Sequence, residues 1–191
     1  EWTVSSATPN GQWDIVVSAA DLLGNAGVDD AHFLVLNKNQ LTGQVELQGF
    51  IGTGTVPPHT RAVTFKATGG TTSKTWTLEL SNASGAVFDF ALTDVPEGTT
   101  GLSAKTSWNL RRKVAVTLDG EGQGVANFTG VKMLPGGDLT GDNQVQLLDY
   151  LLLQDTWYTF DPAADIDGAS GVQFLDYNLL QNNWYTEGDP E

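Results

Sequence analysis

Alternating apolar and polar residues predict β-strands through the middle of the chain. In RAVTFKA, the apolar positions Val63, Phe65 and Ala67 alternate with polar neighbours. The same period of two recurs in three further segments, where the residues on one face are Trp76, Leu78 and Leu80, then Phe88, Phe90 and Leu92, then Val114, Val116 and Leu118. This period is typical of strands with one buried face. Many short strands, separated by turn clusters without helices, predict an antiparallel β-sandwich over residues 43–135.

The first 42 residues carry two more strand-like segments. These are WDIVVSA (13–19) and HFLVLN (32–37), which are joined by DLLGNAGVDD. The pattern leaves two alternatives for residues 1–42. They add strands to the sandwich, or they form a separate ribbon that could act as an exchangeable arm.

The period changes after LPGGD (134–138), so residues 136–191 are predicted to form a further, all-α unit. In residues 147–157, Leu148 and Leu152 line one helical face, while Tyr150, Leu153 and Trp157 line another. Residues 174–184 repeat this pattern with Leu175 and Leu179, and with Tyr177, Leu180 and Trp184. Apolar residues at this spacing predict two short amphipathic helices.

The two predicted helices belong to an internal repeat. At an offset of 27 residues, LLDYLLLQDTWYT (147–159) and FLDYNLLQNNWYT (174–186) match at nine of thirteen positions. Neither copy can bury its apolar stripe alone. We therefore expect the copies to pack face to face about a pseudo-twofold axis.

A twelve-residue acidic loop precedes each helix, with oxygen-bearing residues at the spacing of an EF-hand. The expected ligands of loop one are Asp138, Thr140, Asp142, the Gln144 carbonyl, Gln146 through a water, and Asp149. Those of loop two are Asp165, Asp167, the Gly171 carbonyl, Gln173 and Asp176. Because alternate residues of such a loop point inward, a hard cation can gather about 6–8 oxygens. This predicts two Ca²⁺ sites.

The second of these sites should be the weaker, because Ala169 brings no side-chain ligand to the fifth loop position. Val145 and Val172, at the eighth position, are expected to anchor the paired loops. The alternative is that the aspartates serve only as helix N-caps and turn formers.

Charge is distributed unevenly along the chain. The net charge is −14, and residues 138–191 hold eleven acids and no Lys or Arg. Nucleic acid is therefore not an expected partner, because phosphate binding needs a basic face. The basic run Arg111, Arg112 and Lys113 would complement the acidic unit of the same chain or of a neighbouring copy. No apolar run approaches the ~18–20 residues of a membrane span.

No residue pattern indicates an enzyme. Cysteine is absent, and the two histidines, His32 and His59, lie in no catalytic or metal-binding motif. No pair of carboxylates in the sandwich is typical of a glycosidase. Trp108 is expected to pack in the core or at its rim, and the alternative is that it stacks on a sugar.

Residues 137–186 resemble a dockerin domain, which consists of two half EF-hands, each a calcium loop followed by one helix. The resemblance implies a β-sandwich partner of the cohesin type. It also implies a set of partner-binding positions, which here are Leu147, Leu148, Gln154, Asp155, Thr159, Phe174, Leu175, Gln181, Asn182 and Thr186. Many dockerins have Ser and Thr at positions where this chain has large apolar residues.

A second resemblance covers residues 43–134, which are similar to carboxypeptidase-regulatory or transthyretin-like sandwiches of secreted bacterial proteins. Together the resemblances imply a non-catalytic, extracellular, calcium-binding protein that assembles by docking its C-terminal unit on a β-sandwich. That sandwich could belong to another copy of the chain, in which case the copies would form a filament, tube or surface structure. Two alternatives remain: a fragment of a secreted enzyme or scaffold that binds a separate cohesin, and a carbohydrate-binding sandwich with structural calcium. The start at Glu1 is expected of a processed mature chain or an excised fragment.

Overall fold

The computed structural model of the protein describes residues 11–20, 26–35, 39–52, 59–70, 72–82, 85–169 and 171–191. Within these ranges there are nine strands, one 3-10 turn and two α-helices. The strands are β1 (Gly11–Ala20), β2 (Ala26–Val35), β3 (Gln40–Glu46), β4 (His59–Thr68), β5 (Lys74–Asn82), β6 (Val87–Thr93), β7 (Gly101–Lys105), β8 (Arg112–Ala115) and β9 (Gln123–Phe128). The 3-10 turn η1 (Gly130–Lys132) follows β9, and the helices are α1 (Leu147–Asp155) and α2 (Phe174–Asn182).

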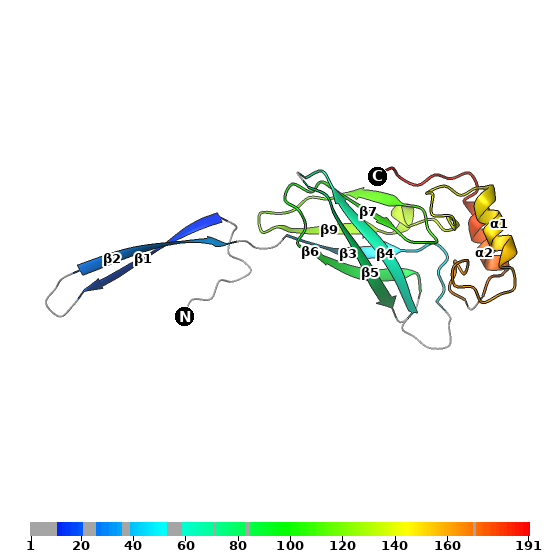
Figure 1. Ribbon diagram of the computed structural model, residues 1–191, viewed down its shortest axis with the longest axis horizontal. Helices are drawn as coiled ribbons and strands as arrows, with labels where there is room; N and C mark the ends of the chain where they lie inside the picture. The colour runs from blue at the N-terminus through cyan, green and yellow to red at the C-terminus, as the bar shows by residue number, and fades with distance from the viewer. Residues whose placement is uncertain are drawn as a thin grey trace.

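Seven of these strands form a β-sandwich (Figure 1). One sheet has the order β6-β3-β9, and the other has the order β5-β4-β7-β8. The sheets share one core, in which the ring of Phe65 on β4 lies 4.4 Å from that of Phe90 on β6 and 6.3 Å from that of Phe128 on β9. Aromatic rings bury large apolar areas and therefore contribute strongly to such a core. The predicted sandwich is confirmed at this level.

The predicted alternation places the expected residues inside. Val63, Phe65 and Ala67 are fully buried, and Phe88, Phe90 and Leu92 are also buried. Trp76 and Leu78 on β5, and Val114 and Leu118 in and after β8, are partly buried and pack against the same core. The strand that opens the sandwich begins at Gln40, slightly before the predicted unit at residue 43.

The sandwich is not wholly antiparallel, and the prediction was wrong on this point. β3 and β9 run parallel, with Gln40 opposite Gln123 and Val45 opposite Phe128. Two-residue hairpins force neighbouring strands to be antiparallel, whereas a parallel pair needs a long connection. β9 enters the three-stranded sheet after the chain has crossed over from β8 in the other sheet, so no hairpin fixes its direction.

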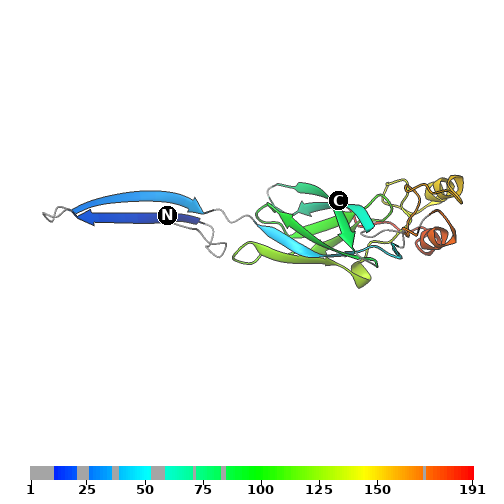
Figure 2. The same cartoon turned by 90° about the horizontal axis from the view of Figure 1, so that it is seen from below.

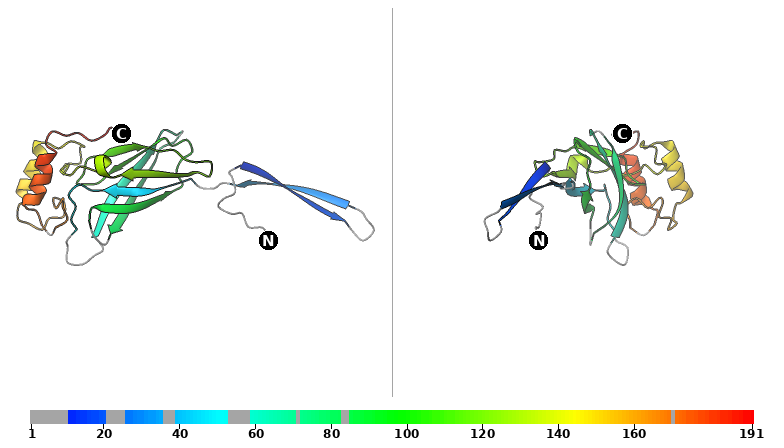
Figure 3. Two further views of the ribbon diagram at one scale, coloured as in Figure 1. Left: turned by 180° about the vertical axis from the view of Figure 1, so that it is seen from behind. Right: turned by 60° about the vertical axis from the view of Figure 1, so that its left-hand side comes forward.

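Strands β1 and β2 form a separate two-stranded antiparallel ribbon, in which Gly11 lies opposite Val35 and Ala20 opposite Ala26. The ribbon lies beyond the end of the sandwich that is opposite the helices (Figures 1 and 3). Of the two alternatives for this region, the structure therefore has the separate ribbon. β2 begins at Ala26, within the segment predicted as a connection, and the predicted strand residues 36 and 37 lie outside the described residues.

The two helices lie side by side at the other end of the sandwich (Figures 1 and 2). Their shared core contains Leu153 and Leu180, both fully buried, and the rings of Tyr150 and Tyr177, with centroids 6.1 Å apart. Leu110, from the connection between β7 and β8, is fully buried in the same cluster. The core of the helical module is thus completed by the sandwich.

The C-terminal segment runs from the module back to the sandwich (Figure 1). Glu191 forms ion pairs with Arg111 at 2.7 Å and with Lys66 at 2.9 Å. Asp189 lies 3.8 Å from Arg112 and accepts a hydrogen bond from the Lys113 backbone N–H at 2.8 Å. The basic run therefore complements the acidic unit of the same chain. Among the described residues, no helix combines the length and the hydropathy needed to cross a bilayer.

Candidate functional site

The two acidic loops are held by a reciprocal exchange of hydrogen bonds about the pseudo-twofold. Val145 of loop one accepts a bond from the Tyr185 N–H and donates one to the Thr186 carbonyl, both at 2.9 Å. Val172 of loop two makes the same two bonds with Tyr158 and Thr159, again at 2.9 Å. The valines thus anchor the loops as expected. However, each valine pairs with the segment after the other helix rather than with the other loop.

Loop two gathers three carboxylates. Asp165, Asp167 and Asp176 each bring a ligand oxygen to within 4.8 Å of the other two. Asp176 is fully buried, and its Oδ1 accepts the N–H groups of Ile166 (2.7 Å) and Asp167 (3.1 Å), while its Oδ2 accepts that of Gln173 (2.8 Å). These bonds draw the start of α2 over the loop, so the three side chains converge although they are up to eleven positions apart.

Two oxygens of this trio are buried without a donor. No group in the described part of the chain donates a hydrogen bond to Asp165 Oδ1 or Asp167 Oδ2. Asp167 is only 1% exposed. Burial raises its pKa to about 6, and the charges of Asp176 and Asp165 act in the same direction. Buried carboxylates are normally paired or bound to a metal. The donor set, all oxygen, suits Ca²⁺.

Loop two is fastened to the sandwich by Arg61 and by the chain after β3. The Arg61 guanidinium donates to the Asp165 carbonyl at 3.0 Å. The backbone N–H of Ile51 donates to the Asp167 carbonyl at 2.8 Å. Gly168 has φ = +69° and lies so close to Phe50 that an added Cβ would approach the ring to 2.5 Å. The loop therefore depends on a glycine here for both its conformation and its fit.

Loop one is arranged differently. The ammonium of Lys105, at the end of β7, forms an ion pair with Asp138 Oδ2, and the same oxygen accepts the Asn143 N–H at 3.1 Å. Asp138 is fully buried; burial raises its pKa, and the bond to Lys105 opposes this rise. Asp149 Oδ1 accepts both the N–H and the hydroxyl of Thr140, at 2.8 and 2.9 Å.

The remaining expected ligands of loop one lie near its surface. Asp142 is exposed and accepts bonds from the Gln144 N–H (2.9 Å) and the Gln146 side-chain amide (2.7 Å). Asp149 Oδ2 accepts the Gln146 N–H at 2.8 Å. Asp138, Asp142 and Asp149 thus each engage donors of the protein, although Asp138 Oδ1, like two oxygens of loop two, is buried without a hydrogen-bond partner in the described part of the chain. Within the described residues, only loop two forms a trio of carboxylates.

In loop two, the other expected ligands flank the trio. Gly171 is buried, and its φ of +133° belongs to the region that favours glycine. Gln173 is exposed and exchanges hydrogen bonds with Asp176 in a capping box: its side chain accepts the Asp176 backbone N–H, and its own N–H donates to Asp176 Oδ2 at 2.8 Å.

Two basic residues of the site, Arg61 and Lys105, were not predicted. They lie 104 and 33 positions from their acidic partners, Asp165 and Asp138. Arg61 belongs to a segment predicted as a strand, where a charged side chain is typical of the solvated face, and Lys105 lies in none of the predicted strands. No local spacing could have linked them to the loops.

The outer side of the helix pair is apolar and exposed. Of the ten expected partner-binding residues, nine are exposed and Thr186 is half-buried. The exposed fractions reach 64% for Phe174, 59% for Leu147 and 57% for Leu148. The neighbouring exposed residues are Leu151, Leu152, Tyr158, Phe160, Leu175 and Tyr185. Leu148 and Leu152, predicted to line one helix face, therefore face solvent. We call this surface, from Leu147 to Tyr185, the apolar helix face.

Two hollows related by the repeat lie on either side of the Tyr150–Tyr177 pair. One, of about 360 Å³, is lined by Gln154, Trp157 and Phe174 besides the two tyrosines. The other, of about 540 Å³, is lined by Gln181, Trp184 and Leu147 besides the same tyrosines. Each lining residue of the first is 27 positions from one of the second. The apolar helix face is thus contoured with twofold pseudo-symmetry.

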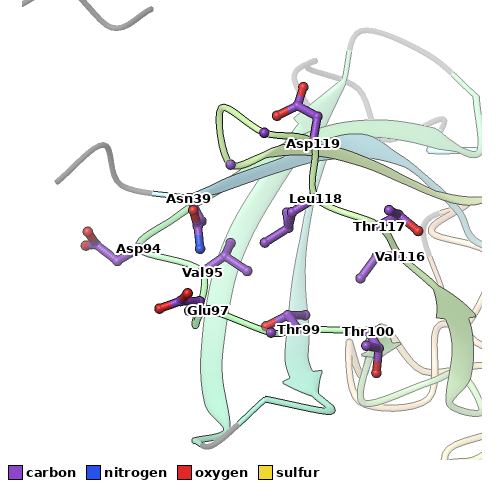
Figure 4. A pocket seen from close by; sticks show the side chains of 13 residues that line it. Asn39, Asp94, Val95, Glu97, Thr99, Thr100, Val116, Thr117, Leu118 and Asp119 are labelled. Atoms are coloured by element: carbon purple, nitrogen blue, oxygen red, sulfur yellow. The ribbon is translucent and has the colours of Figure 1, made fainter. Parts of the chain in front are cut away.

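A larger cleft, of about 740 Å³, lies in the sandwich among the loops that follow β6 and β8 (Figure 4). It is lined largely by backbone and small side chains, with Asp94, Glu97 and Asp119 at its rim (Figure 4).

Trp108 packs within the protein. Its indole N–H donates to the Pro162 carbonyl at 2.9 Å, and the Arg61 guanidinium lies 4.4 Å from its ring centre. The arginine covers this ring, so the packing alternative is the one that the structure shows.

No protein-family model matches the chain, and no curated protein sequence matches it.

Proposed function

We propose that this protein is a non-catalytic calcium-binding assembly protein, whose helical module docks through the apolar helix face on the sandwich of a second copy. The carboxylate trio of loop two carries the calcium part of this proposal. Three carboxylates have oxygens within 4.8 Å of one another, and two of them have a buried oxygen that no donor of the described residues reaches, so a divalent cation would complete this site.

Calcium would stabilise the helical module and hold part of the apolar helix face in position. Asp176 sits in the first turn of α2 and holds the N–H groups of loop two. A cation shared by Asp165, Asp167 and Asp176 would relieve the repulsion among them and fix the start of α2. Because α2 bears Phe174 and Leu175, the same ion would hold half of the apolar helix face in place.

The apolar helix face supports docking on another protein. Large contiguous apolar patches on a soluble chain mark interaction surfaces. The module contacts its own sandwich through Arg61, Leu110 and the loops, so that the helix face is exposed in the described part of the chain and can meet another molecule.

A second copy of the chain offers a complementary surface. Val87 on β6 and Val125 on β9 are 39% and 64% exposed, and Val131 in η1 is 95% exposed. Phe88 and Ala126, which flank the first two, are buried, so these valines lie on the outer side of the three-stranded sheet. Contact between two different surfaces of one chain is heterologous and propagates into filaments or rings.

Sedimentation velocity over a range of concentrations, in Ca²⁺ and in EDTA, tests this proposal. We expect the wild type to assemble as concentration rises in Ca²⁺, and the double variant Leu148→Asp/Leu175→Asp to remain monomeric. The control Ser73→Asp, at an exposed turn away from the helices, should assemble like the wild type.

A wild type that stays monomeric at the highest concentration in Ca²⁺ would contradict self-assembly. If that monomer bound an isolated cohesin-type sandwich, a separate partner would replace the second copy.

A further inference from the structure

The two acidic loops differ in what neutralises them. In loop two, the Arg61 guanidinium donates to the Asp165 backbone carbonyl and its charge acts on all three carboxylates, but the described ion pairs include none to Asp165, Asp167 or Asp176. In loop one, Lys105 forms an ion pair with Asp138. Each loop therefore has a basic side chain of the sandwich beside it, but only in loop one does that side chain form an ion pair with a carboxylate.

The Lys105–Asp138 pair is fixed by a turn of the sandwich. Lys105 ends β7, and the turn after it is closed by Thr106, whose hydroxyl accepts the N–H groups of Trp108 (3.1 Å) and Asn109 (3.0 Å). The Trp108 carbonyl in turn accepts the N–H groups of Gly137 (2.8 Å) and Asp138 (3.2 Å). One short turn thus positions both the ammonium and the carboxylate.

The surroundings of the pair favour a permanent contact. The Lys105 side chain is 16% exposed, and the Asp138 side chain is fully buried. Breaking a buried ion pair leaves an uncompensated charge, which is costly. A divalent ion entering loop one would have to approach Asp138 against the lysine charge, and like charges at such range repel strongly.

We infer that the protein binds one Ca²⁺ ion per chain, in loop two, and that Lys105 serves as the fixed cation of loop one. This inference rests on the proposed calcium binding and adds to it the number of ions and the residue that sets it. Lys105 of the sandwich thereby neutralises loop one, while loop two is neutralised by the bound Ca²⁺.

The matched pair Asp138→Asn and Asp165→Asn tests which loop binds, because both residues occupy the first loop position. In isothermal titration calorimetry, the wild type should take one Ca²⁺ per chain. We expect Asp165→Asn to weaken binding by about tenfold or more, because the site loses one of its charged ligands. Asp138→Asn should leave affinity and stoichiometry unchanged.

The role of Lys105 is tested by Lys105→Met, which keeps the length of the side chain and removes its charge. We expect a second Ca²⁺ per chain in this variant, and one in the control Lys132→Met, at an exposed residue of η1. If Lys105→Met fails to fold, the two asparagine variants alone decide which loop binds Ca²⁺.

The outcomes separate the two proposals. Two ions in the wild type, or lost binding in Asp138→Asn, would overturn the inference and leave calcium binding intact. A folded Lys105→Met variant that still takes one ion would overturn the role of Lys105. No heat with the wild type would overturn both.

Discussion

The guanidinium of Arg61 lies between two aromatic rings, 4.7 Å from the centre of Phe50 and 4.4 Å from that of Trp108. It also donates to the Asp165 carbonyl. One side chain of β4 thus joins three segments: the chain after β3, the β7–β8 connection and loop two. Arginine suits this position because its planar cation stacks on rings while its N–H groups stay free to donate.

Arg61→Ala should lower the free energy of unfolding by about 2 kcal/mol, because it removes two stacking contacts and a charge-assisted hydrogen bond. Urea unfolding followed by tryptophan fluorescence measures the change, and the baseline of the folded state should shift as Trp108 becomes wetter. Arg61→Lys should recover only part of the loss, since an ammonium cannot stack on both rings. Full recovery by lysine would show that charge alone matters here.

At this scale, the sequence predicted the acids of the site but not its bases. The aspartates follow a spacing that a tight loop imposes, so the pattern itself places them together. Arg61 and Lys105 reach the loops only because β4 begins and β7 ends beside the module, which is a property of the assembled sandwich. The sequence also ranked loop one as the better site from its ligand count. That count of ligands did not include Lys105, whose contact with Asp138 depends on the tertiary fold.

The short segments after the helices carry the clearest conformational cost among the described elements. Tyr158 and Tyr185, at matched positions of the repeat, both have φ = +60°. This left-handed conformation costs a non-glycine residue roughly 1–2 kcal/mol. The two tyrosines are nevertheless 81% and 84% exposed, with their rings set edge-on to Trp157 and Trp184. Strain of this kind is often kept for function.

Replacing both tyrosines by Asn, which tolerates the left-handed conformation, should change stability by no more than about 1 kcal/mol, because relief of strain offsets the lost ring contacts. The same variant should assemble more weakly in Ca²⁺, since it removes two large aromatic groups from the apolar helix face. Thermal unfolding and sedimentation velocity measure the two effects separately. Unchanged assembly would assign the tyrosines a role in folding alone.

At the scale of the elements, the alternation and the repeat predicted where strands and helices form, but not how the strands pair. The strands around Phe65 and Phe90 and both helices form where the patterns place them, because burial of one face dictates the period, whereas β8 ends at Ala115, before Val116 and Leu118. The partner of β9 could not be derived, since Gln123–Phe128 is compatible with either direction beside β3. The pairing of Val145 with Tyr185 likewise depends on how the copies cross.

For the whole molecule, the module and the sandwich are continuous rather than linked by a free tether. Leu110 enters the module core, and the Asn183 side-chain amide of the module donates to Gln48 Oε1, just after β3, at 2.5 Å. The segment 187–191 returns to Arg111 and Lys66. We therefore expect the two parts to unfold together when loop two holds Ca²⁺.

Differential scanning calorimetry should show one transition for residues 39–191 of the chain in Ca²⁺. Chelation should separate it into two, with the module unfolding at the lower temperature, because bound ligand stabilises by about 2.7 kcal/mol at a hundredfold excess over its dissociation constant. The Asp165→Asn variant should behave in Ca²⁺ as the wild type does in EDTA. A transition that EDTA leaves unmoved would contradict the stabilising role of calcium.

The reciprocal bonds of Val145 and Val172 have a consequence for how such a module can arise or be divided. The segment after each helix hydrogen-bonds to the loop of the other copy, so half of the module cannot complete its own fold. A chain with a single copy of the repeat would have to obtain these hydrogen bonds from a second molecule, that is, by dimerising. Conversely, proteolysis of the exposed link at Pro162–Ala163 should give two fragments that remain associated through these reciprocal bonds.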